Sequence, residues 1–194
     1  MPKRDATADV IDAVLGFAAS SAVLAAGFVV PNALVVLEKP LNRYLKHLDE
    51  YAREREARRI ISYMKSRGYI AGEYEFGLKI TQRGRKRLQS AEFNSLTIAP
   101  QKRWDHIWRL VFYDIPEDHR YGRQTLTAKL RELGFFQLQQ SVWIHPFPCR
   151  AVIEKVTNNF GLAPYVSYIK TNHLDNQKAL IKRFAKRLPT TSFK

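Results

Sequence analysis

Apolar positions recur along this chain with two periods, and the change between them divides it into halves. Between residues 49 and 67 the spacing is helical, and the residues that share the apolar face are Ala57, Ile60, Ile61 and Met64. Gly68 is placed to end that helix. Two short strand-like runs follow at 69–71 and 77–81, and then a basic helix over 82–88. A helix, a β-hairpin and a second helix form the latter half of a winged helix-turn-helix.

In the second half, strand-like runs are interleaved with helical spacing. The pattern predicts strands over 107–113, 135–139, 141–145 and 165–170, with helices over 119–133 and 150–160. The order β-α-β-β-α-β is the ferredoxin-like split βαβ arrangement. We therefore predict an α+β protein in which N-terminal helices and a winged helix-turn-helix precede a ferredoxin-like domain and a basic C-terminal helix.

Few periodic signals lie between residues 89 and 104, and we interpret this stretch as a connector. The predicted parts are an apolar N-terminal helical segment at 1–48, a winged-helix part at 49–95, a linker at 96–103, the ferredoxin-like domain at 104–175 and a basic tail at 176–194.

The N-terminal run is long enough to suggest a membrane helix. No formal charge occurs from 13 to 37, and about 18 apolar residues are the usual threshold for spanning a bilayer. Pro31 and Asn32 interrupt the run, and basic residues flank both of its ends, so no orientation is favoured. Burial within the protein is the favoured interpretation, and insertion into the inner membrane is the alternative. Acidic residues near the start disfavour a cleaved signal peptide.

Charge narrows the class of partner. The 194 residues include 32 Lys and Arg against 18 Asp and Glu, which gives a net charge of +14. Residues 39–88 hold 14 basic and 6 acidic residues and so contribute +8. This excess favours a polyanion, either nucleic acid or an anionic membrane surface. The single cysteine, Cys149, excludes an internal disulfide and a cysteine-rich zinc site, and it suits a cytoplasmic location.

Double-stranded DNA is the partner that the helix–hairpin–helix order favours, and its binding requires no cofactor. Arginines on the outer side of a helix can follow phosphates and reach base edges in the major groove. The residues predicted on the reading helix are Arg55, Arg58, Arg59, Ser62 and Lys65, and those predicted to contact phosphates are Arg83, Arg85, Lys86 and Arg87. The alternative is a solvated helix face with pairs such as Glu54–Arg58.

Residues 110–142 carry the most specific motif. They contain Tyr113-Asp114-Ile115, then Arg120, and then Gln139-Gln140-Ser141-Val142-Trp143. This set resembles the CRISPR-associated protein two family, whose pattern is a strand ending in Y-D-I, an Arg-containing turn and Q-x-S-V-F. Trp143 stands here in place of Phe. The chain looks even more like the PaaX family of phenylacetate-pathway repressors over residues 49–170. That family carries a W-R-hydrophobic-Y/F-D-I-P first strand and places a winged helix before the same ferredoxin-like domain. The family-motif residues are Tyr113, Asp114, Arg120, Ser141 and Trp143.

The resemblance implies two activities, of which the first is favoured. The PaaX family implies a transcriptional regulator whose winged helix reads DNA and whose ferredoxin-like domain dimerises. The nuclease family implies a metal-dependent endonuclease with Asp114 as the metal ligand. One carboxylate is few for Mg²⁺, so two protomers would share the ion. Alternatively, Asp114 caps the following loop. A third reading is a nucleic-acid-binding protein tethered to a membrane through 13–37.

The strands also predict a homodimer. Large apolar residues occur at both alternations of the first strand, and Trp143 accompanies Val142 and Ile144 on the third. A sheet with one face in water alternates apolar and polar residues instead. A second copy would cover the additional face, with Trp143 as a candidate contact. The alternative cover is the chain itself, through the 175–188 helix or the N-terminal segment.

Overall fold

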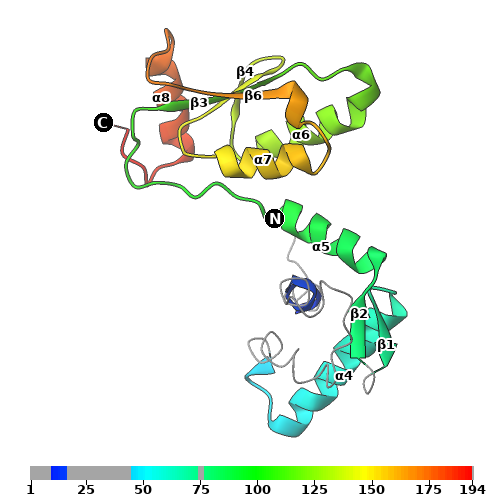
Figure 1. Cartoon of the computed structure of the whole chain (residues 1–194). Coiled ribbons are helices and arrows are strands. Elements are labelled where there is room, and N and C mark those ends of the chain that lie inside the picture. The colour runs from blue at the N-terminus through cyan, green and yellow to red at the C-terminus, as the bar shows by residue number, and fades with distance from the viewer. Residues whose placement is uncertain (1–9, 17–44, 74–76, 194) are drawn as a thin grey trace. The chain divides into compact units, whose positions relative to one another are not determined.

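The computed structural model describes residues 10–16, 45–73 and 77–193 (Figure 1). The chain divides into two compact units, Met1–Asn94 and Ser95–Lys194, called unit 1 and unit 2 below. Both helices and strands are present in each unit, which confirms a mixed α and β protein.

Unit 1 has the predicted order of helix, hairpin and helix. The first helix, α4 (Glu50–Ser66), begins at Asp49, whose carboxylate accepts a hydrogen bond from the Ala52 N–H at 2.7 Å. Such an N-cap satisfies one of the unpaired N–H groups of a helix start. Strands β1 (Ile70–Glu73) and β2 (Gly77–Ile80) pair in antiparallel register.

The helix after the hairpin, α5 (Gln82–Ser95), is longer than predicted. It begins at Thr81, whose hydroxyl accepts a hydrogen bond from the Gly84 N–H at 3.1 Å. The stretch 89–95, interpreted above as part of a connector, is helical. Leu88 is buried in the core of unit 1, and the helix continues beyond it with mostly polar residues, so no apolar period marks its last turns.

Aliphatic side chains form the core of unit 1. The helical segment 10–16 contributes Val10, Ile11, Val14 and Leu15, which pack with Ile61 and Met64 of α4. Residues 13–16 of the uncharged run are therefore in or beside a protein core. The rest of that run lies outside the described residues, and so does most of the N-terminal segment that was expected to complete a winged helix-turn-helix. In the part of the chain that is described, no helix is both long enough and apolar enough to cross a bilayer.

Unit 2 contains a four-stranded antiparallel sheet. Its strands are β3 (Trp108–Tyr113), β4 (Phe136–Gln139), β5 (Val142–His145) and β6 (Val166–Thr171), in the spatial order β4-β5-β3-β6. This order and pairing are those of the ferredoxin-like arrangement. Each strand lies within one residue of its prediction.

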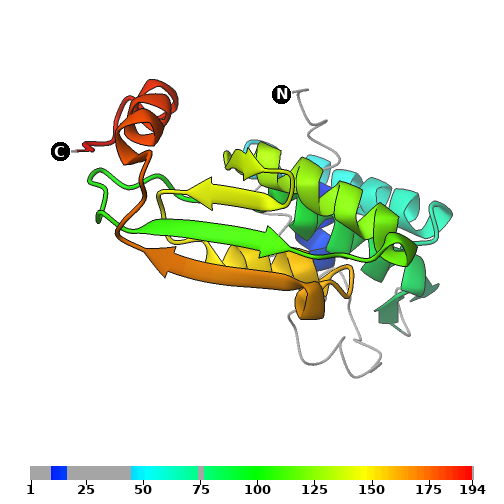
Figure 2. The same ribbon diagram turned by 90° about the horizontal axis from the view of Figure 1, so that it is seen from above.

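Two helices cover one face of this sheet. They are α6 (Arg120–Glu132) and α7 (Arg150–Asn158), preceded and followed by the short helices η1 (Glu117–His119) and η2 (Ala163–Tyr165) (Figure 1). A further helix, α8 (Gln177–Arg187), lies at the end of the sheet where β3 begins (Figure 2). Leu180 and Phe184 of α8 are buried there with Trp104, Trp108 and Ile144.

Apolar residues are buried on both faces of the sheet, and the two faces are covered differently. Val111, Tyr113 and Trp143 lie on the face of α6, where the Tyr113 hydroxyl is 3.0 Å from the Thr127 hydroxyl. Trp143 is therefore covered within the chain, and the proposal that it contacts a second copy is wrong. On the opposite face, α8 covers the end near Trp108. Cover by the 175–188 helix was one of the alternatives predicted for this face.

Candidate functional site

The outer side of α4 carries the predicted DNA-reading residues. Arg55 and Ser62 are exposed, whereas two neighbours are held by acidic residues of the same helix. Arg58 donates to Glu54 Oε1 through Nη2 at 2.7 Å, and Arg59 donates to Glu56 Oε1 at 2.6 Å. The hydrogen bond from Arg59 lowers the pKa of Glu56. The pairing considered above as the alternative, Glu54–Arg58, is thus present.

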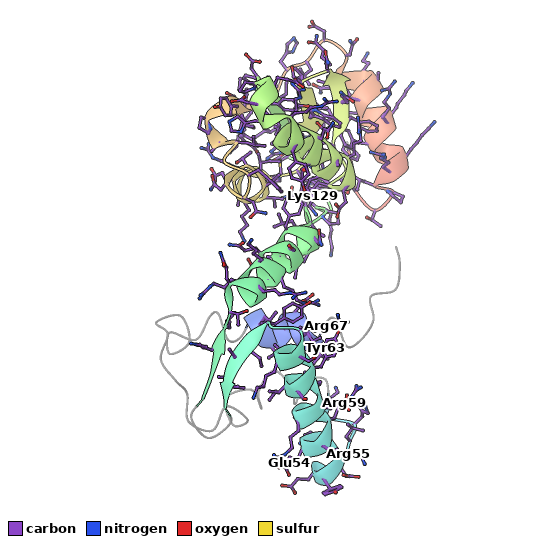
Figure 3. All side chains as sticks on the ribbon, turned by 90° about the vertical axis from the view of Figure 1, so that its right-hand side faces the viewer. Glu54, Arg55, Arg59, Tyr63, Arg67 and Lys129 are labelled. Carbon is purple, nitrogen blue, oxygen red and sulfur yellow. The ribbon has the colours of Figure 1, made fainter. Side chains whose placement is uncertain are left out.

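A ridge of arginines and tyrosines follows α4 at intervals of four residues. Figure 3 shows Arg55, Arg59, Tyr63 and Arg67 succeeding one another along the helix, and Tyr51 continues the row toward the N-terminus. Tyr51 and Tyr63 keep 78% and 40% of their surface exposed. Arg67 donates from Nε to the Tyr63 hydroxyl at 3.1 Å and lies 5.2 Å from the ring centroid. Neither tyrosine was among the predicted residues, because mainly basic positions were considered on this helix, although the i, i+4 spacing of the tyrosines and arginines is visible in the sequence.

On α5, the predicted phosphate contacts fall into two groups. Arg85 and Lys86 are exposed. Arg83 lies 5.8 Å from the Tyr69 ring centroid, and Arg87 lies 5.1 Å from it. Arg87 also donates from Nε to Asp12 Oδ1 at 2.8 Å, with both side chains partly buried. Arg87 therefore joins α5 to the 10–16 segment. This pairing could not be predicted from the sequence, because Arg87 and Asp12 are 75 residues apart.

In unit 2, three of the five motif residues hold elements together. The Tyr113 N–H donates to the Ser141 carbonyl at 3.2 Å, and the Trp143 indole N–H donates to the Tyr113 hydroxyl at 3.4 Å. The hydroxyl in turn donates to the Gln140 carbonyl at 3.3 Å. These contacts tie β3 to β5 and, through Thr127, to α6. Tyr113, Ser141 and Trp143 thus have a structural role in this sheet.

Asp114 is one of the residues that line a polar pocket of about 600 Å³. Its side chain is exposed, and its backbone N–H donates to the Tyr165 carbonyl at 3.0 Å. Arg123 and Ser141 line the same pocket. Arg120, the remaining motif residue, is exposed and lies 3.7 Å from Glu117. Among the described residues, no three metal-ligating side chains come together, so magnesium binding at Asp114 stays a prediction that depends on a second copy.

Comparison with known proteins assigns unit 2. Residues 101–181 match the family model described as the PaaX protein central Cas2-like domain. This part of the chain belongs to the PaaX central-domain family. The match confirms the resemblance drawn from the motif set, and it lies wholly within unit 2, which is called the PaaX central domain below. No curated protein matches the chain.

An ion pair between a buried arginine and an exposed aspartate stabilises the start of β3 in the PaaX central domain. Arg109 lies on the central strand β3 and is only 3% exposed, although its side chain is charged. Its guanidinium donates to Asp105 Oδ1 at 2.7 Å, to the Ile107 carbonyl at 2.7 Å and to the Pro146 carbonyl. The hydrogen bond from Arg109 lowers the pKa of Asp105. Arg109 was missed as a positioning residue, although it is the arginine of the W-R first-strand pattern.

Two further titratable groups of the PaaX central domain are buried in neutral form. His145 accepts a hydrogen bond at Nδ1 from the Phe147 N–H at 3.1 Å, and burial lowers its pKa to about 4. Burial likewise raises the pKa of the Cys149 thiol to about 11. A thiol with such a pKa is a poor nucleophile and metal ligand at neutral pH. Both side chains therefore contribute packing.

Proposed function

We propose that the chain is a DNA-binding transcriptional regulator of PaaX type, in which unit 1 binds double-stranded DNA and the PaaX central domain pairs two copies. The observation that carries the proposal is the match of residues 101–181 to the PaaX central domain. The basic helix–hairpin–helix order of unit 1 supports it, because PaaX repressors place a winged helix before this domain. Such a regulator acts where the chromosome is, in the cytoplasm.

The geometry of α4 supports the DNA-binding part. Ala57, Ile61 and Met64 fix one side of the helix in the core, so the opposite side, with Arg55 and Ser62, projects outward. A helix presented in this way fits the major groove. The Arg58–Glu54 and Arg59–Glu56 pairs are exposed, and exposed pairs contribute only about 0.2–1 kcal/mol. Phosphate oxygens can therefore replace the glutamates as partners of these arginines.

Selection from a random duplex library, followed by titration at several salt concentrations, tests DNA reading. We expect Arg55→Ala with Ser62→Ala to change the preferred bases, and Arg58→Ala to weaken binding on every sequence and lower the salt slope by about one. Arg150→Ala is the matched control, because Arg150 makes the same exposed i, i+4 pair with Glu154 on α7. Unchanged affinity after joint replacement of Arg55, Arg58 and Lys65 would contradict the proposal.

An apolar patch on the sheet supports pairing of two copies. Away from α8, the face opposite α6 and α7 carries Leu138 and Ile169, which are 40% and 48% exposed. Phe112 and Val142 lie opposite each other on the same face and are half-buried. A second copy placed against this patch would remove these side chains from water, which is the main driving force of such interfaces.

Light scattering tests the pairing. We expect twice the chain mass of 22.5 kDa for the wild type and a single chain mass after Ile169→Lys, because a lysine in this apolar patch would be buried without a partner. Tyr121→Lys is the control, since Tyr121 is 75% exposed on α6, on the other side of the sheet. A wild type of single-chain mass at micromolar concentration contradicts the dimer.

A further inference from the structure

Helix α8 carries a concentrated positive charge. Of its eleven residues five are basic and none is acidic, and the basic residues are Lys178, Lys182, Arg183, Lys186 and Arg187. All five are exposed, and we call them the α8 face. Within the described part of the chain, none of the five lies within ion-pair distance of an acidic group, in contrast to Arg58 and Arg59 of α4.

The α8 face is held in place by the packing beneath it. Phe184 is almost fully buried and lies 5.7 Å from the Trp108 ring and 4.6 Å from the Phe136 ring. Phe136 in turn lies under two guanidinium groups, with Arg187 at 4.7 Å and Arg183 at 6.0 Å from its centroid. The arginines are therefore positioned by stacking, which lowers the entropy lost when they bind an anion.

Like charges four residues apart destabilise a helix, and α8 contains three such pairs, at 178/182, 182/186 and 183/187. The buried side of α8 keeps the helix formed in spite of this repulsion. Lys102 and Arg103 are further exposed basic residues of the same domain, and the Lys102 carbonyl accepts a hydrogen bond from the Ser192 N–H at 2.9 Å, five residues after the end of α8. Binding of a polyanion would relieve the repulsion among the basic side chains of this surface.

We propose that the α8 face of the PaaX central domain binds the phosphate backbone of nucleic acid, independently of base sequence and in addition to the contacts of unit 1. The row Lys178, Lys182 and Lys186 rises about 6 Å per step. It therefore spans about 12 Å, a length over which one strand of duplex DNA has about three phosphates.

The buried apolar side of α8 favours nucleic acid over a membrane surface. A helix that lies on a membrane inserts its apolar face among the lipids. In α8 that face is covered by Trp104 and Trp108, and only the charged side is presented. Lysines and arginines that no large exposed apolar side chain accompanies on the same helix fit a phosphate backbone.

Anisotropy titrations of the whole chain with two labelled duplexes of unrelated sequence test the proposal, repeated at several salt concentrations. We expect Lys182→Gln with Lys186→Gln to weaken binding to both duplexes equally and to lower the salt slope by about two. Lys182→Arg with Lys186→Arg is the matched variant that should retain affinity and slope. Lys155→Gln, at an exposed lysine of α7 in the same domain, controls for the change in net charge and should leave the slope unchanged.

The same titrations in an Arg55→Ala, Ser62→Ala background separate this proposal from the function proposed for unit 1. If unit 1 reads no sequence, both duplexes bind alike, and the glutamine pair still lowers the slope. A slope that the glutamine pair leaves unchanged, with tryptophan fluorescence confirming a native fold, overturns the proposal. So does a variant that loses binding to phosphatidylserine vesicles but keeps its affinity for both duplexes, because the partner of the α8 face is then a membrane.

Discussion

The two units of this protein bury different kinds of side chain. In the described residues of unit 1 the buried apolar cluster consists of Val, Ile, Leu, Ala and Met. All three tryptophans lie in the PaaX central domain, and each is at most 1% exposed. Aromatic rings bury large areas and prefer tilted or edge-to-face contacts, and Trp104 and Trp108 pack in this way at 4.6 Å. Tryptophan fluorescence therefore reports on the PaaX central domain, while far-ultraviolet circular dichroism reports on both units.

Basic residues on the helices of unit 1 and on α8 also differ in their acidic partners. In unit 1, Arg58, Arg59 and Arg87 are paired with Glu54, Glu56 and Asp12. On α8 of the PaaX central domain, the basic residues are stacked or solvated. The number of basic residues determines how strongly the protein attracts a polyanion at long range. Which basic residues then contact the polyanion depends on whether each side chain is already paired with an acidic residue.

The largest expected effect comes from a cavity in either core. Phe184→Ala should destabilise the PaaX central domain by about 3–5 kcal/mol, because the ring fills the space between α8 and the sheet. Met64→Ala, at a fully buried residue of unit 1, should cost about 2–5 kcal/mol. We expect the first to shift the fluorescence transition in urea and the second to shift only the dichroism. A single common transition for both variants would show that the units unfold together.

Acid should act on the PaaX central domain through His145. Its pKa is about 4 in the folded state against an ordinary value of 6.5, so the unfolded chain binds a proton first as the pH falls. Stability is then lost between pH 6.5 and 4, by up to about 3 kcal/mol. Asp105, whose pKa is lowered, adds a further loss below its ordinary value of 3.8. Urea unfolding followed by fluorescence across this range measures the effect.

His145→Gln should flatten this pH profile between 6.5 and 4. His173→Gln is the control, because the His173 side chain is 88% exposed and its replacement should leave the profile as it is. A wild-type stability that does not change between pH 6.5 and 4.5 would contradict the assignment.

A smaller effect is expected from a methyl group in unit 1. The Cβ of an alanine at Gly84 would lie 2.1 Å from the Tyr69 carbonyl oxygen and 2.8 Å from Ile80 Cγ2. That carbonyl accepts the Thr81 N–H at the start of α5, so it cannot move without loss. Gly84→Ala should destabilise unit 1 by about 2 kcal/mol or more, measured by dichroism.

At Gly16 an added Cβ would meet no atom closer than Leu88 Cδ1, at an ordinary 3.8 Å. Gly16→Ala should therefore stabilise unit 1 by up to about 1 kcal/mol.

The smallest effect is expected from removing the acidic partners of the arginines on α4, which tests how these partners limit DNA binding. Glu54→Gln with Glu56→Gln removes the acidic partners of Arg58 and Arg59, and we expect duplex binding to tighten about threefold because the arginines no longer exchange partners. Helix stability should fall by about 0.2–0.5 kcal/mol per pair. Glu154→Gln removes the same kind of pair from α7 and should alter affinity less. Equal gains from both changes would indicate an effect of net charge alone.

Helices and strands were predictable where the periodicity of apolar residues agrees with the Gly and Pro residues that end an element. The four strands of the sheet were placed within one residue because Pro116 follows the first apolar run and the two helices between the runs end close to Gly134 and Gly161. The end of α5 was not, because its last two turns are mostly polar. Among site residues, exposure of Arg55, Ser62, Arg85 and Lys86 agrees with the prediction. The partners of Arg87 and Arg109 could not be found in this way.

By itself, the sequence determined the α and β content, the helix–hairpin–helix order, the ferredoxin-like strand order and the PaaX motif, because each depends on local period or on neighbouring residues. Only the tertiary structure decided that Trp143 faces α6, that Arg87 binds Asp12 and that α8 covers one end of the sheet. The physical reason is that these outcomes depend on which surfaces meet when the chain folds. Such contacts join residues tens of positions apart, and the energy of each is set by the burial and charge of partners that no local pattern specifies.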